Sequence, residues 1–369
     1  MSRSRRLNLM APNSGGTSAT GVLNNKYDPV RVFHHISARA DLPRTSFSVV
    51  RIMVLCGVLS ACGTSKSIQS PPSAELEANA SSYLITVVLA VAQFDDARAF
   101  SVSPDGSIYV VENNKGAILR LDSEGTLLGT QGGPGTGEDQ FLNPRDIDAS
   151  SGLFYTVADA GNGRVQKFTR DGAFVESLAI PSVMGAAKVL SIIPSFRLSG
   201  VRTRAGESEP VKIVESPWSE LILIDGVSHS VLKIDRLRES ITIIGGPDSG
   251  AGHLENPVDV GVGNGIIVVA DDIRNEIVFF DEFGSFIRSW SAVLENLVAL
   301  RLDRGEVWLA YSDFLRVFDL RGGRIEEYSF ELGAALIDFS VEPGVIWLMT
   351  AKSLYRIDRT ALDQVLSEN

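Results

Sequence analysis

Short apolar runs separated by polar turns recur along most of the chain. Residues 266–271 read IIVVAD and residues 276–281 read EIVFFD, with a polar turn between them. Runs of this length that are rich in Val, Ile and Phe and bounded by Gly, Asn and Asp are typical of β-strands. Turns such as Asp-Gly and Glu-Gly supply residues that accept positive φ between strands. This pattern predicts an all-β protein with many short strands.

One element of this pattern occurs six times. The copies ILRLD, VQKFT, VLKID, IVFFD, LRVFD and LYRID end 47, 66, 46, 38 and 39 residues apart. A repeat of roughly 40 residues with this composition is the period of a β-propeller blade. We therefore expect a six-bladed β-propeller of four-stranded blades over residues 83–360, with a short tail at 361–369.

Two of the units are long enough to be compared in detail. Residues 132–172 and 245–284 both run through a Gly-rich segment, Asn-Pro, an inner strand, Val-Ala-Asp, a turn with Asn and Arg, and a Val-x-x-Phe strand. This order resembles the NHL repeat, strongly in the second and fourth blades and fairly in the first. The resemblance covers about residues 95–360 and implies a six-bladed NHL-like propeller.

The sixth blade lacks an outer strand of its own. It offers strands at about 336–341, 345–350 and 353–358, and only ALDQVLSEN follows the last of these. The run YLITVVLAV at 83–91 precedes the first blade and is too short to cross a bilayer, which needs about 20 apolar residues. We expect residues 83–91 to pair with 353–358, because this closes the ring and covers an open edge.

The first 61 residues differ in charge from the rest. They hold eight Lys or Arg against two Asp, a charge of +6, and subtracting it from the net charge of −11 leaves −17 for the remainder. A domain this acidic repels phosphate groups. The charge therefore excludes nucleic acid as an expected partner.

The N-terminal segment ends in a secretory pattern. Arg51 precedes the apolar run 52–59, and residues 59–62 read LSAC, which resembles a bacterial lipobox. The resemblance implies a signal peptide at 49–61 and a lipidated Cys62 that anchors the protein to the membrane of a bacterial cell envelope, on the periplasmic or outer face. The alternative is an apolar strand that ends in cysteine.

The segments on either side of this signal read as linkers. Residues 1–48 show no periodicity, so we expect a disordered extension or a start site placed too far upstream. Residues 62–82 are small and polar, which favours a flexible tether. Removal of the signal takes Cys56 with it and leaves Cys62 without a second cysteine to pair with.

The third blade carries about twenty extra residues. They fall in 182–210, where apolar and basic side chains stand together, a mixture enriched at protein interfaces. We take the insertion as a candidate partner-binding loop, with neutral drift in loop length as the alternative. The candidate binding residues are Phe196, Arg197, Leu198, Arg202 and Arg204.

Three aspartates share one position of the repeat, near the start of the inner strand. Asp146, Asp259 and Asp338 at one level around a channel could bind a hard cation such as Ca²⁺. The corresponding positions in the first and fifth blades, Ser101 and Ala299, add no ligand. The alternative is that these aspartates accept structural hydrogen bonds. A second set of acidic residues ends the second strands, and we expect each of them to accept hydrogen bonds from backbone amides of the following turn: Glu112, Asp159, Asp225 and Asp271.

Motifs for catalysis are missing from the sequence. His229 and His253 stand alone in turns and do not make a zinc site. No phosphate loop, nucleophile elbow or paired cysteines occur. The expected function is therefore non-enzymatic binding of an envelope protein or peptide through one propeller face, without a cofactor. Two alternatives stay open: a divalent-cation-dependent hydrolase or lactonase, and a structural subunit of an envelope complex.

Overall fold

The computed structural model describes residues 81–85, 90–181, 189–191, 208–246 and 248–359. Almost all regular structure in these ranges is β-strand, with three single-turn 3-10 helices. No helix in the described ranges has the length and apolar character that a membrane crossing requires. The all-β prediction is therefore confirmed.

Six sheets follow one another along the chain, and each forms one blade. Blade 1 consists of β3 (Ala97–Val102), β4 (Ile108–Glu112), β5 (Ala117–Leu121) and β6 (Leu127–Gly132). Blade 2 consists of β7 (Pro144–Asp148), β8 (Phe154–Asp159), β9 (Arg164–Thr169) and β10 (Phe174–Ala179). Blade 3 consists of β12 (Pro210–Glu215), β13 (Leu221–Asp225), β14 (Ser230–Ile234) and β15 (Ser240–Ile244).

The second half of the ring repeats this arrangement. Blade 4 consists of β16 (Pro257–Gly263), β17 (Ile266–Asp271), β18 (Glu276–Asp281) and β19 (Phe286–Ser291). Blade 5 consists of β20 (Ala299–Asp303), β21 (Glu306–Ala310), β22 (Phe314–Asp319) and β23 (Arg324–Phe330). Blade 6 consists of β24 (Leu336–Glu342), β25 (Val345–Thr350), β26 (Ser353–Asp358) and the N-terminal strand β2 (Ala90–Gln93).

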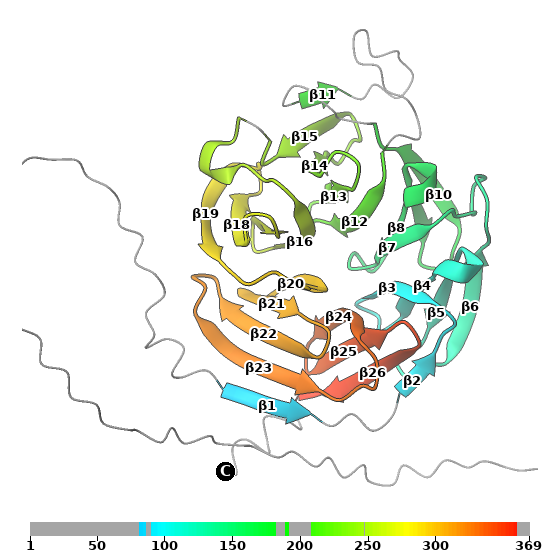
Figure 1. Ribbon diagram of the computed structural model, residues 1–369. Helices are drawn as coiled ribbons and strands as arrows, with labels where there is room; N and C mark the ends of the chain where they lie inside the picture. Colours follow the sequence, from blue (N-terminus) through cyan, green and yellow to red (C-terminus); the bar gives the residue numbers. More distant parts are fainter. Residues whose placement is uncertain (1–80, 86–89, 182–188, 192–207, 247, 360–369) are drawn as a thin grey trace, which may run out of the picture. The chain divides into compact units, whose positions relative to one another are not determined.

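The inner strands form a closed circuit. Each of β3, β7, β12, β16, β20 and β24 contacts the inner strand of the next blade, and β24 contacts β3 (Figure 1). The six sequence repeats correspond to the third strands, β5, β9, β14, β18, β22 and β26. The prediction of a six-bladed propeller with four-stranded blades is confirmed.

The N-terminal residues close the ring in a different way from the one expected. β2 pairs antiparallel with β26, with Ala90 opposite Tyr355, so an N-terminal strand does complete blade 6. The prediction of one strand over 83–91 was wrong, because β1 (Ser81–Ile85) pairs in parallel with β23 of blade 5. Ile85 is buried there in the core between blades 5 and 6, and burial of this apolar side chain favours the separate position of β1.

Two blades carry a fifth strand at their outer edge. β1 lies outside β23 in blade 5, and β11 (Val189–Ser191) lies outside β15 in blade 3. β11 belongs to the long insertion of the third repeat and pairs antiparallel with β15. These added strands cover edges that would otherwise present unpaired backbone groups.

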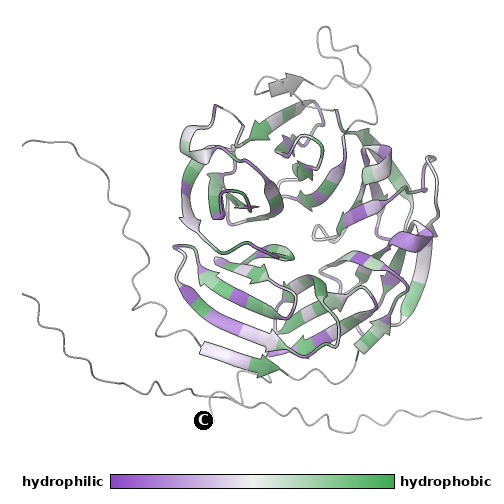
Figure 2. Ribbon diagram, viewed as in Figure 1, coloured by the Kyte–Doolittle hydropathy of each residue, from purple (hydrophilic) through white to green (hydrophobic). Residues whose placement is uncertain are grey.

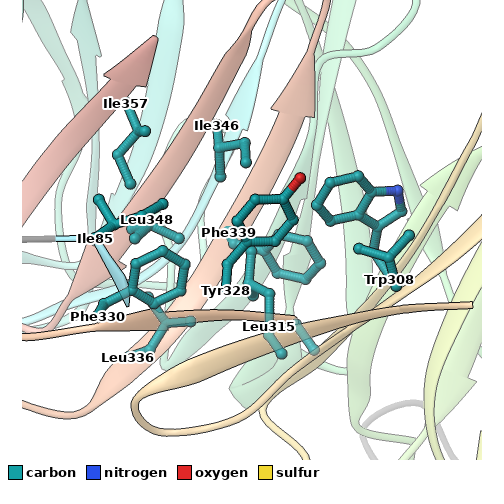
Figure 3. Packing of buried hydrophobic residues seen from close by; sticks show 13 residues of the cluster. Ile85, Trp308, Leu315, Tyr328, Phe330, Leu336, Phe339, Ile346, Leu348 and Ile357 are labelled. Atoms are coloured by element: carbon teal, nitrogen blue, oxygen red, sulfur yellow. The ribbon is translucent and has the colours of Figure 1, made fainter. Parts of the chain in front are cut away.

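The core lies between neighbouring blades. Figure 2 shows hydrophobic residues along the strands of each blade, with hydrophilic residues interspersed, as in β23. Between blades 5 and 6, Trp308 stacks on Tyr328 with ring centroids 5.8 Å apart, and Phe339 lies beside them (Figure 3). Each sheet buries both faces in this way, so the strands read as apolar runs and not as a simple alternation.

The closing strand also contacts the turn between β5 and β6 of blade 1. Gly125 in that turn has φ of +85°, and a Cβ there would overlap the Val91 carbonyl of β2. Gly106 in another turn of blade 1 has nearly the same φ, +84°, but its Cβ would meet only Ser123, at 3.9 Å. The two glycines thus separate the cost of the backbone conformation from the cost of displacing β2.

We expect Gly125→Ala to destabilise the protein more than Gly106→Ala. Both substitutions place an alanine at positive φ, which destabilises the folded state. Only the alanine at 125 also overlaps the closing strand, and this overlap costs about a further 1–3 kcal/mol. Urea unfolding of both variants measures the difference in the free energy of unfolding. Equal losses in the two variants would contradict the contact between β2 and this turn.

Candidate functional site

The register of the first two strands in each blade shows which residues share one level around the channel. Asp146 pairs with Ala158, Asp259 with Ala270 and Asp338 with Met349. The same level in blades 1, 3 and 5 holds Ala99, Lys212 and Ala299. The ring in chain order therefore reads Ala, Asp, Lys, Asp, Ala, Asp.

Each ring aspartate is hydrogen-bonded to the next blade. The amide of Ile213 donates to Asp146 Oδ2 at 2.8 Å. In the same way the amide of Leu300 donates to Asp259 Oδ2 at 2.7 Å, and the amide of Phe100 to Asp338 Oδ2 at 3.0 Å. Each donor is the residue that follows the ring position in the neighbouring inner strand. The aspartates of blades 2, 4 and 6 thus join all three even blades to the odd blades that follow them.

The register corrects one expected ring member. Ser101 was expected at the ring level of blade 1. The register shift that precedes Asp146 in blade 2 lies between Ala97 and Ala99 in blade 1, so Ala99 holds the ring level and Ser101 lies two residues further on. Ser101 Oγ accepts the amide of Ala149 at 2.9 Å, and Asp148 Oδ2 accepts the amide of Glu215. A second level of the channel therefore also joins neighbouring blades through side-chain acceptors.

Two cations lie among the ring carboxylates. Arg301 in β20 contacts Asp338 Oδ1 through Nη2, and its Nη1 lies 3.5 Å from Asp259 Oδ2. Lys212 Nζ lies 3.7 Å from the same Asp259 oxygen. Arg301 thereby links blades 4, 5 and 6, and Lys212 links blades 3 and 4.

Sequence reasoning missed both cations. Lys212 had a signal, because Pro-Val-Lys at 210–212 matches Pro-Val-Asp at 257–259 in the repeat alignment. Arg301 had none, since its counterparts two residues beyond the other ring positions include Ser101, Asp148 and Ser340.

Burial and mutual charge shift the pKa values of this network. Burial raises the pKa of Asp146 to about 7, and the charge of Asp338 adds to the rise while Lys212 and Arg301 oppose it. Burial alone would lower the pKa of Lys212 and of Arg301. Asp259 and then Asp146 raise the pKa of Lys212 above its ordinary value, and Asp338 and then Asp259 do the same for Arg301. Lys212 and Arg301 are therefore held as cations that neutralise buried carboxylates.

The channel holds a small cavity, and the ring residues Asp146 and Asp259 are part of its wall. Its volume is about 210 Å³, and its polar lining includes Asp148, Arg301, Asp303 and Glu342. Within the described ranges, no group of three or more His, Cys, Asp or Glu side chains is placed to hold a metal ion. The hypothesis that Asp146, Asp259 and Asp338 bind Ca²⁺ stays a prediction, and the hydrogen bonds to the next blade favour the structural alternative.

The acidic residues that end the second strands have structural partners at another level. Asp159 Oδ1 accepts the amide of Leu142 at 2.7 Å, and Asp159 Oδ2 accepts from Arg164 Nε at 2.7 Å. Asp271 accepts the amide of Glu255 at 2.6 Å, and also the amide of Arg274 in the following turn. The expected bonds to the following turn are therefore only part of the pattern, because these carboxylates also hold the segment that enters their own blade.

The other predicted site residues lie outside the described residues. These are Cys62 in the lipobox-like segment and the insertion residues Phe196, Arg197, Leu198, Arg202 and Arg204. Both ends of the insertion are described. The amide of Ile180 donates to Gly163 O at 2.9 Å, and Ser208 Oγ donates to Asp225 Oδ1 at 2.9 Å. The insertion therefore leaves and re-enters at the face that carries the loops between second and third strands.

The fold and the repeats together define a six-bladed β-propeller. No protein family model matches the chain. Part of the chain is similar to NHL repeat-containing protein 3 of Homo sapiens, with 33% identity over 82 residues, which are 21% of this chain and 24% of that protein. The match thus spans about a quarter of that relative. Together with the six four-stranded blades of the ring, this partial match supports the resemblance to NHL-repeat propellers.

Solved structures resemble the chain in fold at low sequence identity. A gluconolactonase from Xanthomonas campestris has a TM-score of 0.54 at 11% identity, covering 72% of this chain and 86% of that one. A virginiamycin B lyase from Staphylococcus aureus has a TM-score of 0.49 at 14% identity, covering 71% and 94%. At 11% identity, the similarity to the gluconolactonase shows the propeller fold alone.

The raised pKa of Asp146 predicts a pH-dependent stability. Between about pH 4 and 7 the Asp146 carboxyl has lost its proton in the unfolded chain but keeps it in the folded protein. The free energy of unfolding of the wild type therefore falls as pH rises, by up to about 1.4 kcal/mol per pH unit. Asp146→Asn removes this titration. We expect urea unfolding at pH 4.5 and 8 to show the variant gaining stability relative to the wild type at the higher pH. If the two proteins differed in free energy of unfolding by the same amount at both pH values, the raised pKa of Asp146 would be contradicted.

Calcium tests the cation hypothesis directly. A ligand that binds only the folded state raises the melting temperature. We expect millimolar calcium to leave the wild-type melting temperature unchanged, because Asp259 and Asp338 already contact backbone amides and Arg301. A rise that disappears in Asp259→Asn would establish the ion site instead.

Proposed function

We propose that this propeller is a non-enzymatic binding protein that takes a protein or peptide partner through the face bearing the insertion at 182–210. The observation that carries the proposal is the use of the channel charges. Asp146, Asp259 and Asp338 each bind an amide of the next blade, and Lys212 and Arg301 neutralise them. Carboxylates used in this way support a structural hub in preference to a hydrolytic site.

The residues on both sides of the insertion are held by hydrogen bonds. Asp225 accepts bonds from Ser208, Glu209 and Ser228, so the strand that follows the insertion is tied to blade 3. Gly163 receives the amide of Ile180 just before the insertion. A loop carried on a rigid scaffold loses less conformational entropy on binding, which supports a recognition role for it.

The chemistry of the insertion favours an acidic partner surface. The chain after residue 61 has a net charge of −17, and Arg197, Arg202 and Arg204 are basic residues within this acidic part. Arginine beside apolar residues such as Phe196 is a mixture found at interface hot spots. We therefore infer a partner that offers carboxylates around an apolar contact.

The same proposal places the protein at a bacterial envelope membrane through a lipid on Cys62. The LSAC sequence and the polar segment that follows it support this anchor, since acyl chains bind a protein to a bilayer through their buried methylenes. A structural role within an envelope complex is the variant of this proposal in which the partner is a permanent subunit.

Charge reversal tests the binding face. We expect the triple change of Arg197, Arg202 and Arg204 to Glu to reduce recovery of cross-linked envelope partners at least about tenfold, a loss typical of hot-spot residues. The matched control changes three exposed arginines of the described domain, Arg236, Arg304 and Arg321, to Glu. Quantitative mass spectrometry after affinity purification gives the readout. Equal recovery from the two triple variants would refute the proposed face.

Fatty-acid labelling tests the anchor. We expect metabolic labelling of the wild type and of Cys56→Ser, because Cys56 precedes the proposed cleavage site, and no labelling of Cys62→Ser. The comparison uses the only two cysteines of the chain. Labelling of Cys62→Ser at the wild-type level would overturn the lipoprotein assignment.

A further inference from the structure

A second cavity lies between blades 1 and 2, away from the channel. Its volume is about 430 Å³, which falls within the range of small-molecule sites. Its walls come from Arg120 of β5, from residues 128–132 of β6 and from residues 170–172 in the turn between β9 and β10. Tyr109 and Tyr155 also line it.

The two tyrosines and Gln131 have their hydrogen-bonding groups satisfied inside the protein. The Tyr109 hydroxyl donates to the carbonyl of Arg170 at 3.0 Å, and the Tyr155 hydroxyl donates to Gln131 Oε1. Gln131 Nε2 in turn donates to Gly172 O at 2.6 Å and to Asp139 Oδ1 at 2.8 Å. The tyrosine rings pack with centroids 4.6 Å apart. This part of the lining is therefore fixed before any ligand arrives.

The two guanidinium groups of the cavity are only weakly engaged. Arg120 Nε is buried and has no hydrogen-bond partner among the described residues. Arg120 Nη1 lies 3.5 Å from Asp171, whose side chain is 80% exposed, and Arg170 Nη1 lies 3.4 Å from Asp105. These separations are at the long limit for a hydrogen bond. Guanidinium groups held only by such long contacts can exchange them for a better-placed acceptor.

The backbone leaves room beside Arg120. Gly129 is the cross-strand partner of Arg120, so a side chain at 129 would stand on the same face of the sheet. A Cβ at Gly129 would meet no atom within 4 Å. The space next to the guanidinium is thus open because residue 129 is glycine.

We propose that this cavity binds the oxyanion group of a small ligand, a carboxylate or a phosphate, with Arg120 as the main donor and Arg170 as the second cation. The planar guanidinium offers paired donors that match both oxyanions, and its two terminal Nη groups make such a pair. Asp139 is held by Gln131, while the exposed Asp171 is free to turn away when an anion replaces it beside Arg120. The nearby carboxylates keep the site close to neutral, which favours a ligand with one anionic group over a polyanion.

Calorimetric titration with sodium phosphate and with sodium acetate, at constant ionic strength, tests the site. We expect at least one anion to bind the wild type in the millimolar range and to bind Arg120→Gln and Gly129→Leu at least about tenfold more weakly, because the first lacks the donors and the second fills the space. Arg288→Gln in blade 4, where Arg288 stacks over Phe279, is the control and should bind as the wild type does.

The two probes separate the possible ligands. Binding of phosphate alone would identify a phosphate-bearing ligand, and binding of acetate alone a carboxylate. Melting curves of the variants check that each is folded, and Gly129→Leu retains both arginines if Arg120→Gln does not fold. No heat from either anion with the wild type, or equal affinity in the wild type and a folded Arg120→Gln or Gly129→Leu, would overturn the proposal.

Discussion

The hydrogen bond that a ring aspartate accepts from an amide of the next blade is the interaction on which the ring depends. An inner strand has no sheet neighbour on its channel side, so its backbone groups need partners from elsewhere. Asp146, Asp259 and Asp338 supply acceptors at one level. A buried carboxylate is costly when it is unpaired, and Lys212 and Arg301 reduce that cost.

This use of charge also limits what the channel can do. A catalytic or metal-binding carboxylate needs an oxygen directed at a substrate or an ion, whereas Oδ2 of each ring aspartate accepts an amide of the next blade. A propeller fold by itself does not distinguish an enzyme from a binding protein, so the side chains must decide between them. Those described in the channel favour a structural hub, and this moves attention to the outer surface and its loops.

The outer strands show how the fold accepts additions. β1 and β11 extend blades 5 and 3 through backbone pairing with β23 and β15. These additions lie at the outer edges of their blades, whereas the inner strands contact one another around the ring. The cavity beside β6 also lies away from the ring of aspartates.

The sequence by itself determined the number of blades, their strands and their class. Apolar runs, turn glycines and the repeated third strand are local signals, and strand pairing within a blade joins residues close in the chain. It also placed Asp146, Asp259 and Asp338 at one level, because the repeat transfers a position from blade to blade. Lys212 could have been found in the same way from Pro-Val-Lys.

Only the tertiary structure decided which groups meet across blades. Phe100 and Asp338 lie 238 residues apart, and they touch because the ring closes. The position of Arg301 between Asp259 and Asp338 follows from the packing of three blades and has no repeat signal. The N-terminal run is divided into β1 and β2, and burial of Ile85 between blades 5 and 6 favours this division. These contacts depend on packing between segments that are distant in the chain, and local patterns of hydrophobicity carry no information about such packing.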